Sequence, residues 1–377
     1  MKRINFIIGL LLVYTTGFAQ LGGGVQSPQV HADRTVTFRF RPADTAKPQK
    51  VELSGGQFWT PGRVPMVRDT TGTWSVTIGP VVPNLYPYSF IVDGISVADP
   101  RNPDYFPNET FKNSLLDVIG DAPPLYSADK DVPHGTVSYR LYYSKSMDLM
   151  RNMVVYTPPG YEENTRKEYP VLYLIHGATD TEETWFKVGH VNLIMDNLIA
   201  KGQAEPMIIV MPYANAAPAL QKANRTLDAS KFGGDIFRNE LIKEIIPYTE
   251  KQYRALKSSD KRAIAGFSRG GGQTLAAGAK HPEIFGYVAA YAPAIRGDQA
   301  ALEASIGTTY ASADELKKLK LFTISTGTDD SLYPFSKIFS EVLTKNNIKH
   351  QTLFTSGGHT WMNCRLYITG TAKQLFK

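Results

Sequence analysis

Residues 261–279, KRAIAGFSRGGGQTLAAGA, are the stretch from which the rest of the fold is inferred. A short apolar run at residues 263–265 predicts a strand, and the small residues from about Gly271 onward predict a helix. Between them, GFSRG at residues 266–270 fits Gly-x-Ser-x-Gly, a sharp strand-to-helix turn that exposes its serine. The turn strains the serine backbone, and glycine two positions to either side avoids a clash with the neighbouring chain. The motif therefore predicts that Ser268 is a nucleophile beside the N-terminal N–H groups of a helix.

The composition favours a globular protein of about two domains. The chain has 377 residues, and its 42% hydrophobic content is enough for buried cores. The formal net charge is +6, but the basic residues are scattered among acidic ones and form no run that would follow a phosphate backbone. We therefore expect no nucleic-acid partner. Cys364 is the single cysteine, which excludes an intrachain disulfide, and no Cys/His cluster has the spacing of metal ligands.

Residues 1–19 have the features of a secretory signal peptide. Lys2 and Arg3 form the positive start, residues 7–13 the apolar core, and GFA at residues 17–19 the small-residue cleavage site. The apolar run is much shorter than the ~20 residues that a membrane span requires. We therefore expect a secreted or periplasmic protein without a membrane span, whose mature chain begins with a flexible leader at residues 20–29.

Residues 30–120 have the pattern of an antiparallel β-sandwich. Apolar and polar residues alternate at residues 35–40 and 74–78, and turn signals such as Asp93-Gly94 separate the runs. Several short strands at this spacing predict a small two-sheet domain. Residues 121–130, which begin with Asp-Ala-Pro-Pro, are predicted to be the linker that follows it.

This segment resembles the early-set, immunoglobulin-like sandwiches related to family 48 carbohydrate-binding modules. The resemblance rests on VELSGGQF at residues 51–58, GTWSV at 72–76 and YPYSFIVDG at 86–94, in that order. It implies a possible glycan-binding role for the domain. Trp59 or Tyr105 could stack on a sugar, but core or interdomain packing is the commoner role for a single aromatic residue here.

Residues 131–377 have the pattern of an α/β domain. Near-continuous apolar runs at residues 169–175, 207–211 and 321–325 are typical of strands buried on both faces of a parallel sheet. Helical patterns occur between such runs, at residues 192–201, 237–253 and 336–346. This alternation predicts an α/β domain with a mainly parallel central sheet, preceded by the smaller antiparallel β-sandwich. With the serine turn, the expected fold class is that of an α/β-hydrolase catalytic domain.

The serine needs a general base, usually a histidine that a carboxylate orients. His281 lies at the exit of the helix after Ser268, and His350 lies within an alternating, strand-like pattern. His359, in contrast, follows a strand and lies in a glycine-rich loop, SGGHTW, which can carry it over the sheet edge. His359 is therefore the predicted base.

The acid of such a site lies between the serine and the histidine, at the carboxyl end of a strand. The apolar run at residues 321–325 is that strand, and it continues into TGTDDS. On spacing alone, Asp329 and Asp330 are both candidates, and the one that is not used would cap the next helix.

An oxyanion hole needs two backbone N–H groups, one from the residue after the nucleophile and one from the loop after an earlier strand. Arg269 supplies the first. The strand that ends at His176 leads into Gly177-Ala178-Thr179, and Ala178 is the predicted second donor, with Gly177 or Thr179 as substitutes. His176 ends a buried strand ahead of the serine, so a structural role is expected for it.

These motifs together are similar to carbohydrate esterase family 1, the feruloyl and acetylxylan esterases related to esterase D. The motifs are YPVLYLIHG at residues 169–177, AGFS at 265–268, GTDDSL at 327–332 and GGH at 357–359. The resemblance implies that the aspartate immediately before Ser-Leu, Asp330, is the acid. Relatives commonly carry methionine where this chain has Arg269, a departure that leaves the backbone donor unaffected but could alter the substrates accepted.

The resemblance implies a serine esterase that removes acyl groups from plant cell-wall polysaccharide, with feruloyl the first choice and acetyl the second. Such a mechanism needs no cofactor. Trp361, beside the base, could face an aromatic acyl group or brace the histidine loop. Two alternatives stay open: a siderophore esterase, which also pairs a sandwich with this kind of domain, and a non-catalytic glycan-binding protein.

Overall fold

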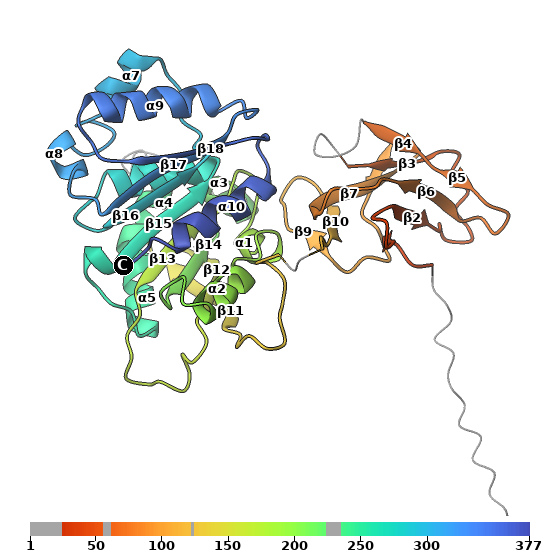
Figure 1. Ribbon diagram of the computed structural model, residues 1–377, viewed down its shortest axis with the longest axis horizontal. Helices are drawn as coiled ribbons and strands as arrows, with labels where there is room; N and C mark the ends of the chain where they lie inside the picture. The colour runs from red at the N-terminus through yellow and green to blue at the C-terminus, as the bar shows by residue number, and fades with distance from the viewer. Residues whose placement is uncertain (1–24, 56–61, 122–123, 224–234) are drawn as a thin grey trace, which may run out of the picture.

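The computed structural model of the chain describes residues 25–55, 62–121, 124–223 and 235–377. It has a small all-β body followed by a larger α/β body (Figure 1). The predicted signal peptide, the first half of the leader (residues 20–24) and Trp59 lie outside the described residues. In the described part of the chain, no helix combines the length and the apolar character that a membrane crossing requires.

The all-β body has two antiparallel sheets. The first has the strand order β1 (Gln29–Val30), β2 (Val36–Phe40), β6 (Trp74–Ile78), β5 (Val67–Arg68). The second has the order β4 (Arg63–Pro65), β3 (Val51–Ser54), β7 (Asn84–Val92), β10 (Asn113–Val118), β9 (Tyr105–Phe106), with β8 (Ile95–Val97) also on β7.

Alternation along the strands explains why the two sheets pack together. Val36, Phe38 and Phe40 of β2 point inward and are buried with Tyr88 and Phe90 of β7 in one apolar core. The rings of Phe38 and Tyr88 meet edge to face, with centroids 4.9 Å apart. The sandwich predicted from the alternation is confirmed.

The α/β body is built on one eight-stranded sheet. Its strand order is β11 (Thr136–Ser144), β12 (Leu149–Thr157), β14 (Ile208–Pro212), β13 (Val171–Ile175), β15 (Arg262–Phe267), β16 (Tyr287–Tyr291), β17 (Leu321–Gly327), β18 (Gln351–Thr355). The strands from β14 to β18 are parallel, whereas β11 and β12 pair in antiparallel fashion with each other and β12 with β14. The predicted mainly parallel α/β-hydrolase sheet is therefore confirmed.

Helices cover both faces of this sheet. The helical segments are α1 (Thr184–Lys187), α2 (Val191–Ala200), α3 (Ala216–Lys222), α4 (Ile236–Glu240), the π turn Leu241–Ile245, α5 (Ile246–Gln252), the 3₁₀ turn Ser259–Lys261, α6 (Arg269–Thr274), the π turn Leu275–Ala279, α7 (Gln299–Ala304), α8 (Ala313–Leu316), α9 (Tyr333–Lys345) and α10 (Trp361–Ala372). Helices α2 and α10 pack into the apolar core on one face, and α4, α5 and α9 into the core on the other.

Two local predictions are wrong in detail. The helix after the serine turn begins at Arg269, two residues earlier than the sequence predicts. Glycine has a low helix propensity, so its presence in the first turn hid the helix start, but close packing requires glycine there. The strand expected around His350 begins only at Gln351, and the side chain of His350 contacts Ser340 of α9 instead.

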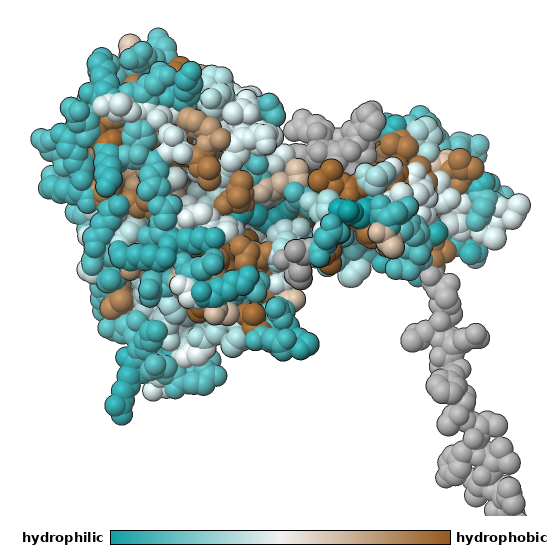
Figure 2. Space-filling model, viewed as in Figure 1, coloured by the Kyte–Doolittle hydropathy of each residue, from teal (hydrophilic) through white to brown (hydrophobic). Residues whose placement is uncertain are grey.

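The apolar core of the α/β body continues into the sandwich. Leu85, Phe106 and Leu115 of the sandwich belong to the same buried cluster as Val188 and Trp361. On the face in Figure 2, apolar residues gather on both sides of the junction between the two bodies. The sandwich thus lies against the loops at the carboxyl ends of the parallel strands, where ligands of open α/β sheets bind.

Candidate active site

Ser268 occupies a strained turn between β15 and α6. Its backbone has φ +58° and ψ −119°, a conformation that residues with a side chain rarely adopt. A Cβ on Gly266 would lie 2.4 Å from the carbonyl oxygen of Gly270, and a Cβ on Gly270 would lie 2.3 Å from that of His176. Both glycines of the motif are therefore required by close backbone approach, which is the steric reason for the Gly-x-Ser-x-Gly spacing.

The structure brings Ser268, Asp330 and His359 together from the carboxyl ends of three strands of one sheet, β15, β17 and β18. The Nε2 atom of His359 lies 2.8 Å from the Oγ of Ser268. On the other side of the imidazole ring, Nδ1 lies 2.6 Å from Oδ2 of Asp330. These distances match a nucleophile, a base and an orienting carboxylate in one hydrogen-bonded chain.

The two candidate aspartates have different partners. Asp330 is buried, and its carboxylate also accepts a hydrogen bond from the backbone N–H of Leu332 at 2.9 Å. Asp329 is exposed, and its carboxylate accepts from the backbone N–H of Gly357 at 3.1 Å. Asp330 is thus the aspartate that reaches the imidazole, while Asp329 ties the turn after β17 to the histidine loop.

Aromatic packing holds the imidazole ring of His359. The ring of Phe267, from the serine motif itself, stacks on it with centroids 4.5 Å apart and an interplanar angle of 29°. Trp361 packs edge-on against Phe267 and against Trp185, at centroid distances of 5.5 Å and 4.8 Å. Trp361 therefore braces the histidine loop, one of the two roles considered for it.

The two predicted oxyanion donors flank the serine. Arg269 is the first residue of α6, so its N–H is one of those that the helix leaves unpaired. Ala178 lies in the loop after β13 and lines the same cavity as Ser268 and His359. His176 is buried beneath this loop, where its Nε2 accepts from the N–H of Ala214 at 2.9 Å and its Nδ1 faces the carbonyl oxygen of Gly177 at 2.8 Å. Burial lowers the pKa of His176 to about 4, so the ring is neutral and structural.

Asp180 is a residue of this loop that the sequence reasoning missed. It is 5% exposed, and burial raises the pKa of its carboxyl group to about 7, although hydrogen bonds from Asn108, the Gly177 backbone and Trp361 oppose the rise. The carboxyl group therefore links the loop that carries Ala178 to the loop that carries His359. The only sequence signal was a carboxylate five residues after the end of a buried strand.

The side chain of Arg269 points to a polar group outside the triad. Its guanidinium donates a hydrogen bond to Oδ1 of Asn215 at 3.0 Å. The amide nitrogen of Asn215 in turn donates to the carboxylate of Glu109, a residue of the sandwich, at 2.9 Å. Arg269 is therefore held by Asn215 of the α/β body and linked through it to Glu109 of the sandwich.

A cavity of about 390 Å³ opens at Ser268 and has walls from both bodies. Phe267 and Trp361 line it from the α/β body, and Pro87, Phe106 and Phe111 line it from the sandwich. A second cavity, of about 770 Å³, shares His359 with the first and is lined mainly by polar groups of the β17–α9 and β18–α10 loops. The imidazole thus lies between an apolar and a polar cavity.

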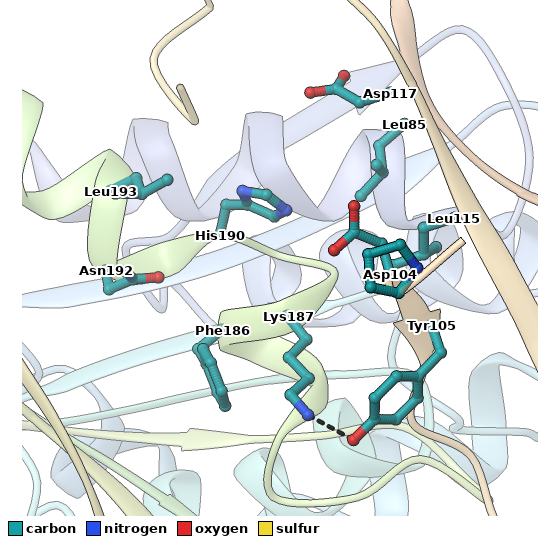
Figure 3. Close-up of a pocket in the computed structure, with 11 residues that line it drawn as sticks. Leu85, Asp104, Tyr105, Leu115, Asp117, Phe186, Lys187, His190, Asn192 and Leu193 are labelled. Carbon is teal, nitrogen blue, oxygen red and sulfur yellow. Dashed lines mark hydrogen bonds between the residues drawn. The ribbon is translucent and has the colours of Figure 1, made fainter. Parts of the chain in front are cut away.

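Another pocket, of about 370 Å³, lies at the junction between the bodies and contains none of the triad residues (Figure 3). Tyr105 lies at its edge, where its hydroxyl hydrogen-bonds Nζ of Lys187, which also lies 4.2 Å from the Tyr105 ring centroid. Interdomain packing, the preferred expectation for Tyr105, is what the contacts show.

Comparison with known proteins agrees with the motifs. The protein-family model for esterases matches residues 144–333. An endo-1,4-beta-xylanase/feruloyl esterase of Xylanibacter ruminicola is 33% identical over 269 residues, which are 70% of this chain but only 36% of that protein. The chain therefore spans about a third of the length of that relative.

Solved structures show the same relationship. A CE1 ferulic acid esterase from the anaerobic fungus Anaeromyces mucronatus is 31% identical, with a TM-score of 0.56 over 68% of this chain and 96% of its own. The enterobactin esterase of Shigella flexneri is 17% identical, with a TM-score of 0.66 over 91% of this chain and 92% of its own, which shows a shared fold across both bodies. The chain belongs to the esterase family, and its resemblance to carbohydrate esterase family 1 is confirmed.

Proposed function

We propose that this carboxylic ester hydrolase is a serine esterase that releases acyl groups, feruloyl above all, from plant cell-wall polysaccharide such as arabinoxylan. The observation that carries the proposal is the hydrogen-bonded chain from Ser268 through His359 to Asp330 at the mouth of an aromatic-walled cavity.

In the proposed mechanism, Oγ of Ser268 attacks the ester carbonyl while Nε2 of His359 takes the hydroxyl proton. The carbonyl electron pair moves to the oxygen, and the backbone N–H groups of Arg269 and Ala178 stabilise the resulting oxyanion. The intermediate collapses as the C–O bond to the alcohol breaks, and His359 returns its proton to the departing alcohol oxygen. Water then attacks the acyl-enzyme by the same route and releases the acid. Asp330 holds the imidazole tautomer and stabilises the imidazolium.

The two cavities that meet at His359 suit the two halves of such an ester. A feruloyl group is planar and aromatic, and the apolar cavity, with Phe106, Phe111 and Trp361 among its lining residues, offers rings to pack against it. The polar cavity, lined in part by Ser356, Thr360 and Asn363, suits a sugar alcohol. A cavity of about 390 Å³ is larger than an acetyl group requires, so acetyl is the second choice.

The proposal extends to location and partner. The signal-peptide pattern at residues 1–19 supports a secreted or periplasmic protein, where plant polysaccharide is accessible. The named relative from Xylanibacter ruminicola, a xylanase/feruloyl esterase, supports an acylated xylan as the substrate.

A siderophore esterase is the second candidate, because the enterobactin esterase of Shigella flexneri shares the fold over 91% of this chain. A catechol trilactone also carries aromatic acyl groups, so the aromatic wall alone does not separate the two. The non-catalytic alternative fits poorly with a serine, histidine and aspartate in hydrogen-bonding contact.

A panel of esters tests the proposal. Purified protein and a Ser268→Ala variant are given methyl ferulate, feruloylated arabinoxylan, acetylated xylan and a catechol trilactone, and the released acids are quantified by chromatography. We expect ferulate release with the highest kcat/KM, reduced about 10³-fold or more in Ser268→Ala. Preferential cleavage of the trilactone would assign the siderophore role, and activity that survives in Ser268→Ala would sink the catalytic assignment.

A further inference from the structure

A short segment of the sandwich lies directly on the loop that carries the proposed oxyanion donor Ala178. The backbone N–H of Glu109 donates to the carbonyl oxygen of Thr179 at 2.7 Å. The side-chain amide of Asn108 donates to Oγ1 of Thr179 at 3.0 Å and to Oδ1 of Asp180 at 3.1 Å. Asn108 and Asp180 also pair as an isolated antiparallel β-bridge. The two residues after Ala178 are thus held by two consecutive residues of another domain.

The loop needs such support because Thr179 has an unfavourable backbone. Its φ is +62°, in the left-handed region, which is uncommon for any residue other than glycine and especially for a β-branched one. A conformation of this kind persists only where the surroundings over-determine it. Both the backbone oxygen and the side-chain hydroxyl of Thr179 accept hydrogen bonds from the sandwich. The sandwich therefore stabilises Thr179 in this unfavourable conformation.

Asn108 is itself fixed and cannot follow a moving loop. It is 2% exposed, and its Oδ1 accepts from both the backbone N–H and the hydroxyl of Thr110, each at 2.9 Å. Because these bonds from Thr110 hold the side-chain oxygen of Asn108, its amide nitrogen points to Thr179 and Asp180. The carboxyl group of Asp180 then connects back to the Gly177 backbone, which closes the loop around Ala178.

The second oxyanion residue is connected to the same segment. The carboxylate of Glu109 accepts from the amide of Asn215 at 2.9 Å and from the hydroxyl of Tyr213. Asn215 accepts from the guanidinium of Arg269 at 3.0 Å, and its amide also donates to the carbonyl oxygen of Asp180 at 3.1 Å. Residues 108–109 therefore reach the surroundings of both oxyanion donors.

We propose that Asn108, with the Glu109 backbone, is a positioning residue of the oxyanion hole, and that the sandwich is a working part of the esterase site. This inference rests on the serine-esterase function proposed above. Asn108 lines the cavity at Ser268, but the role proposed for it does not require contact with the reacting carbonyl group. It acts through Thr179 and Asp180, by fixing the direction of the Ala178 N–H where the oxyanion develops.

A purely structural role, in which the segment only joins the two domains, predicts different kinetics. Loss of docking would lower thermal stability and affect substrate binding and turnover together. Loss of oxyanion positioning affects an interaction made only in the transition state, so kcat falls while KM stays nearly constant. Lys187 offers a matched control, because its contact with Tyr105 also joins the two domains but lies in the pocket without triad residues.

The test uses the full chain and 4-nitrophenyl acetate, a small ester that depends little on either cavity. Asn108→Ala, Thr179→Gly, the double variant and Lys187→Met are compared with the wild type, and Ser268→Ala sets the background. We expect Asn108→Ala to lower kcat about 10- to 100-fold with KM changed less than about threefold, since loss of a whole oxyanion donor costs about 10²- to 10³-fold. Lys187→Met is expected to keep kcat.

The double variant tests the route through Thr179. Glycine adopts a positive φ at little cost, so in the Thr179→Gly background the loop no longer needs the sandwich as strongly. The kcat loss from Asn108→Ala is then expected to shrink at least about threefold, a coupling that a shared interaction requires. If Asn108→Ala does not fold, Thr179→Ala removes the same hydrogen bond from the other side and is expected to lower kcat in the same way.

Three results would overturn the inference. These are an unchanged kcat in Asn108→Ala, an equal loss in both Thr179 backgrounds, or a loss in Lys187→Met of the same size. A wild type that hydrolyses the ester no faster than Ser268→Ala overturns the proposed function and this inference with it. Hydrolysis that depends on Ser268 but not on Asn108 overturns the inference alone.

Discussion

Asp330 and Asp329 are adjacent, and replacing each of them singly by asparagine should lower the rate of ester hydrolysis to very different extents. In Asp330→Asn, an amide replaces a buried carboxylate that lies 2.6 Å from Nδ1 of His359. The amide can donate to Nδ1 and so favours the tautomer with its proton on Nε2, which cannot accept the proton of Ser268. It also removes the negative charge that stabilises the imidazolium. The same change in serine proteases lowers kcat about 10⁴-fold, or ~5.5 kcal/mol of transition-state stabilisation.

Asp329→Asn is the matched control. Its carboxylate is exposed and accepts one backbone N–H, that of Gly357 at 3.1 Å, which an asparagine oxygen can also accept. A single hydrogen bond of this kind contributes about 0.5–1.5 kcal/mol, so we expect a loss of kcat/KM of about tenfold at most.

The assay is initial-rate hydrolysis of 4-nitrophenyl acetate and methyl ferulate at pH 8, with thermal unfolding as a check that both variants fold. The expected ratio between the two variants is about 10³ or more. The assignment of Asp330 is refuted if Asp329→Asn loses as much activity as Asp330→Asn, or more.

Three further predictions concern the turn, the cavity and the buried carboxyl group. Gly270→Ala places a Cβ 2.3 Å from the carbonyl oxygen of His176, whereas the Cβ of Gly272→Ala lies 3.2 Å from its nearest neighbour. The Tm of Gly270→Ala should therefore fall by more than that of Gly272→Ala, and equal Tm values would contradict the steric argument. Phe111→Ala should lower kcat/KM for methyl ferulate about 10- to 100-fold but leave 4-nitrophenyl acetate nearly unchanged, and parallel losses would exclude Phe111 from the acyl wall. Burial raises the pKa of Asp180 to about 7, above its value in the unfolded chain, so folding favours the protonated form. The contribution of this carboxyl group to stability therefore declines as the pH rises from about 4 to about 7. In urea titrations the free energy of unfolding of the wild type should therefore fall relative to that of Asp180→Asn, by up to ~4 kcal/mol, and a constant difference across this window would contradict the shift.

The sequence predicted the parts of the fold that local patterns determine. Buried strands such as β13 and β17 are continuous apolar runs, and the sharp turn at Ser268 carries its steric requirement in its glycines. The aspartate and histidine follow strand ends in a fixed order, so the chain order alone brought them close to the serine. The choice of Asp330 over Asp329 needed the family resemblance, because the two aspartates are adjacent and follow the same strand end.

The sequence did not predict the features that depend on distant contacts. Strand β16, YVAAY, is a five-residue apolar run that does not by itself distinguish strand from helix. The partners of Arg269 and of Asp180 come from segments 54 and 72 positions away, Asn215 and Asn108, in loops without periodicity. No pattern within either loop indicates that the two meet.

The hydrogen bonds between the sandwich and the loop after β13 have a consequence for how activity is gained during folding. They join residues 71 and 72 positions apart, and the bond between Ser268 and His359 joins residues 91 apart. Contacts of such sequence separation form late, because the chain must first lose the entropy of closing long loops. The helices of the α/β body, whose hydrogen bonds are local, can therefore form before the sheet and the shape around Ala178 are set. After dilution from denaturant, hydrolysis should return no faster than the slower of the two domains folds and docks, and it should lag behind the far-ultraviolet circular dichroism signal.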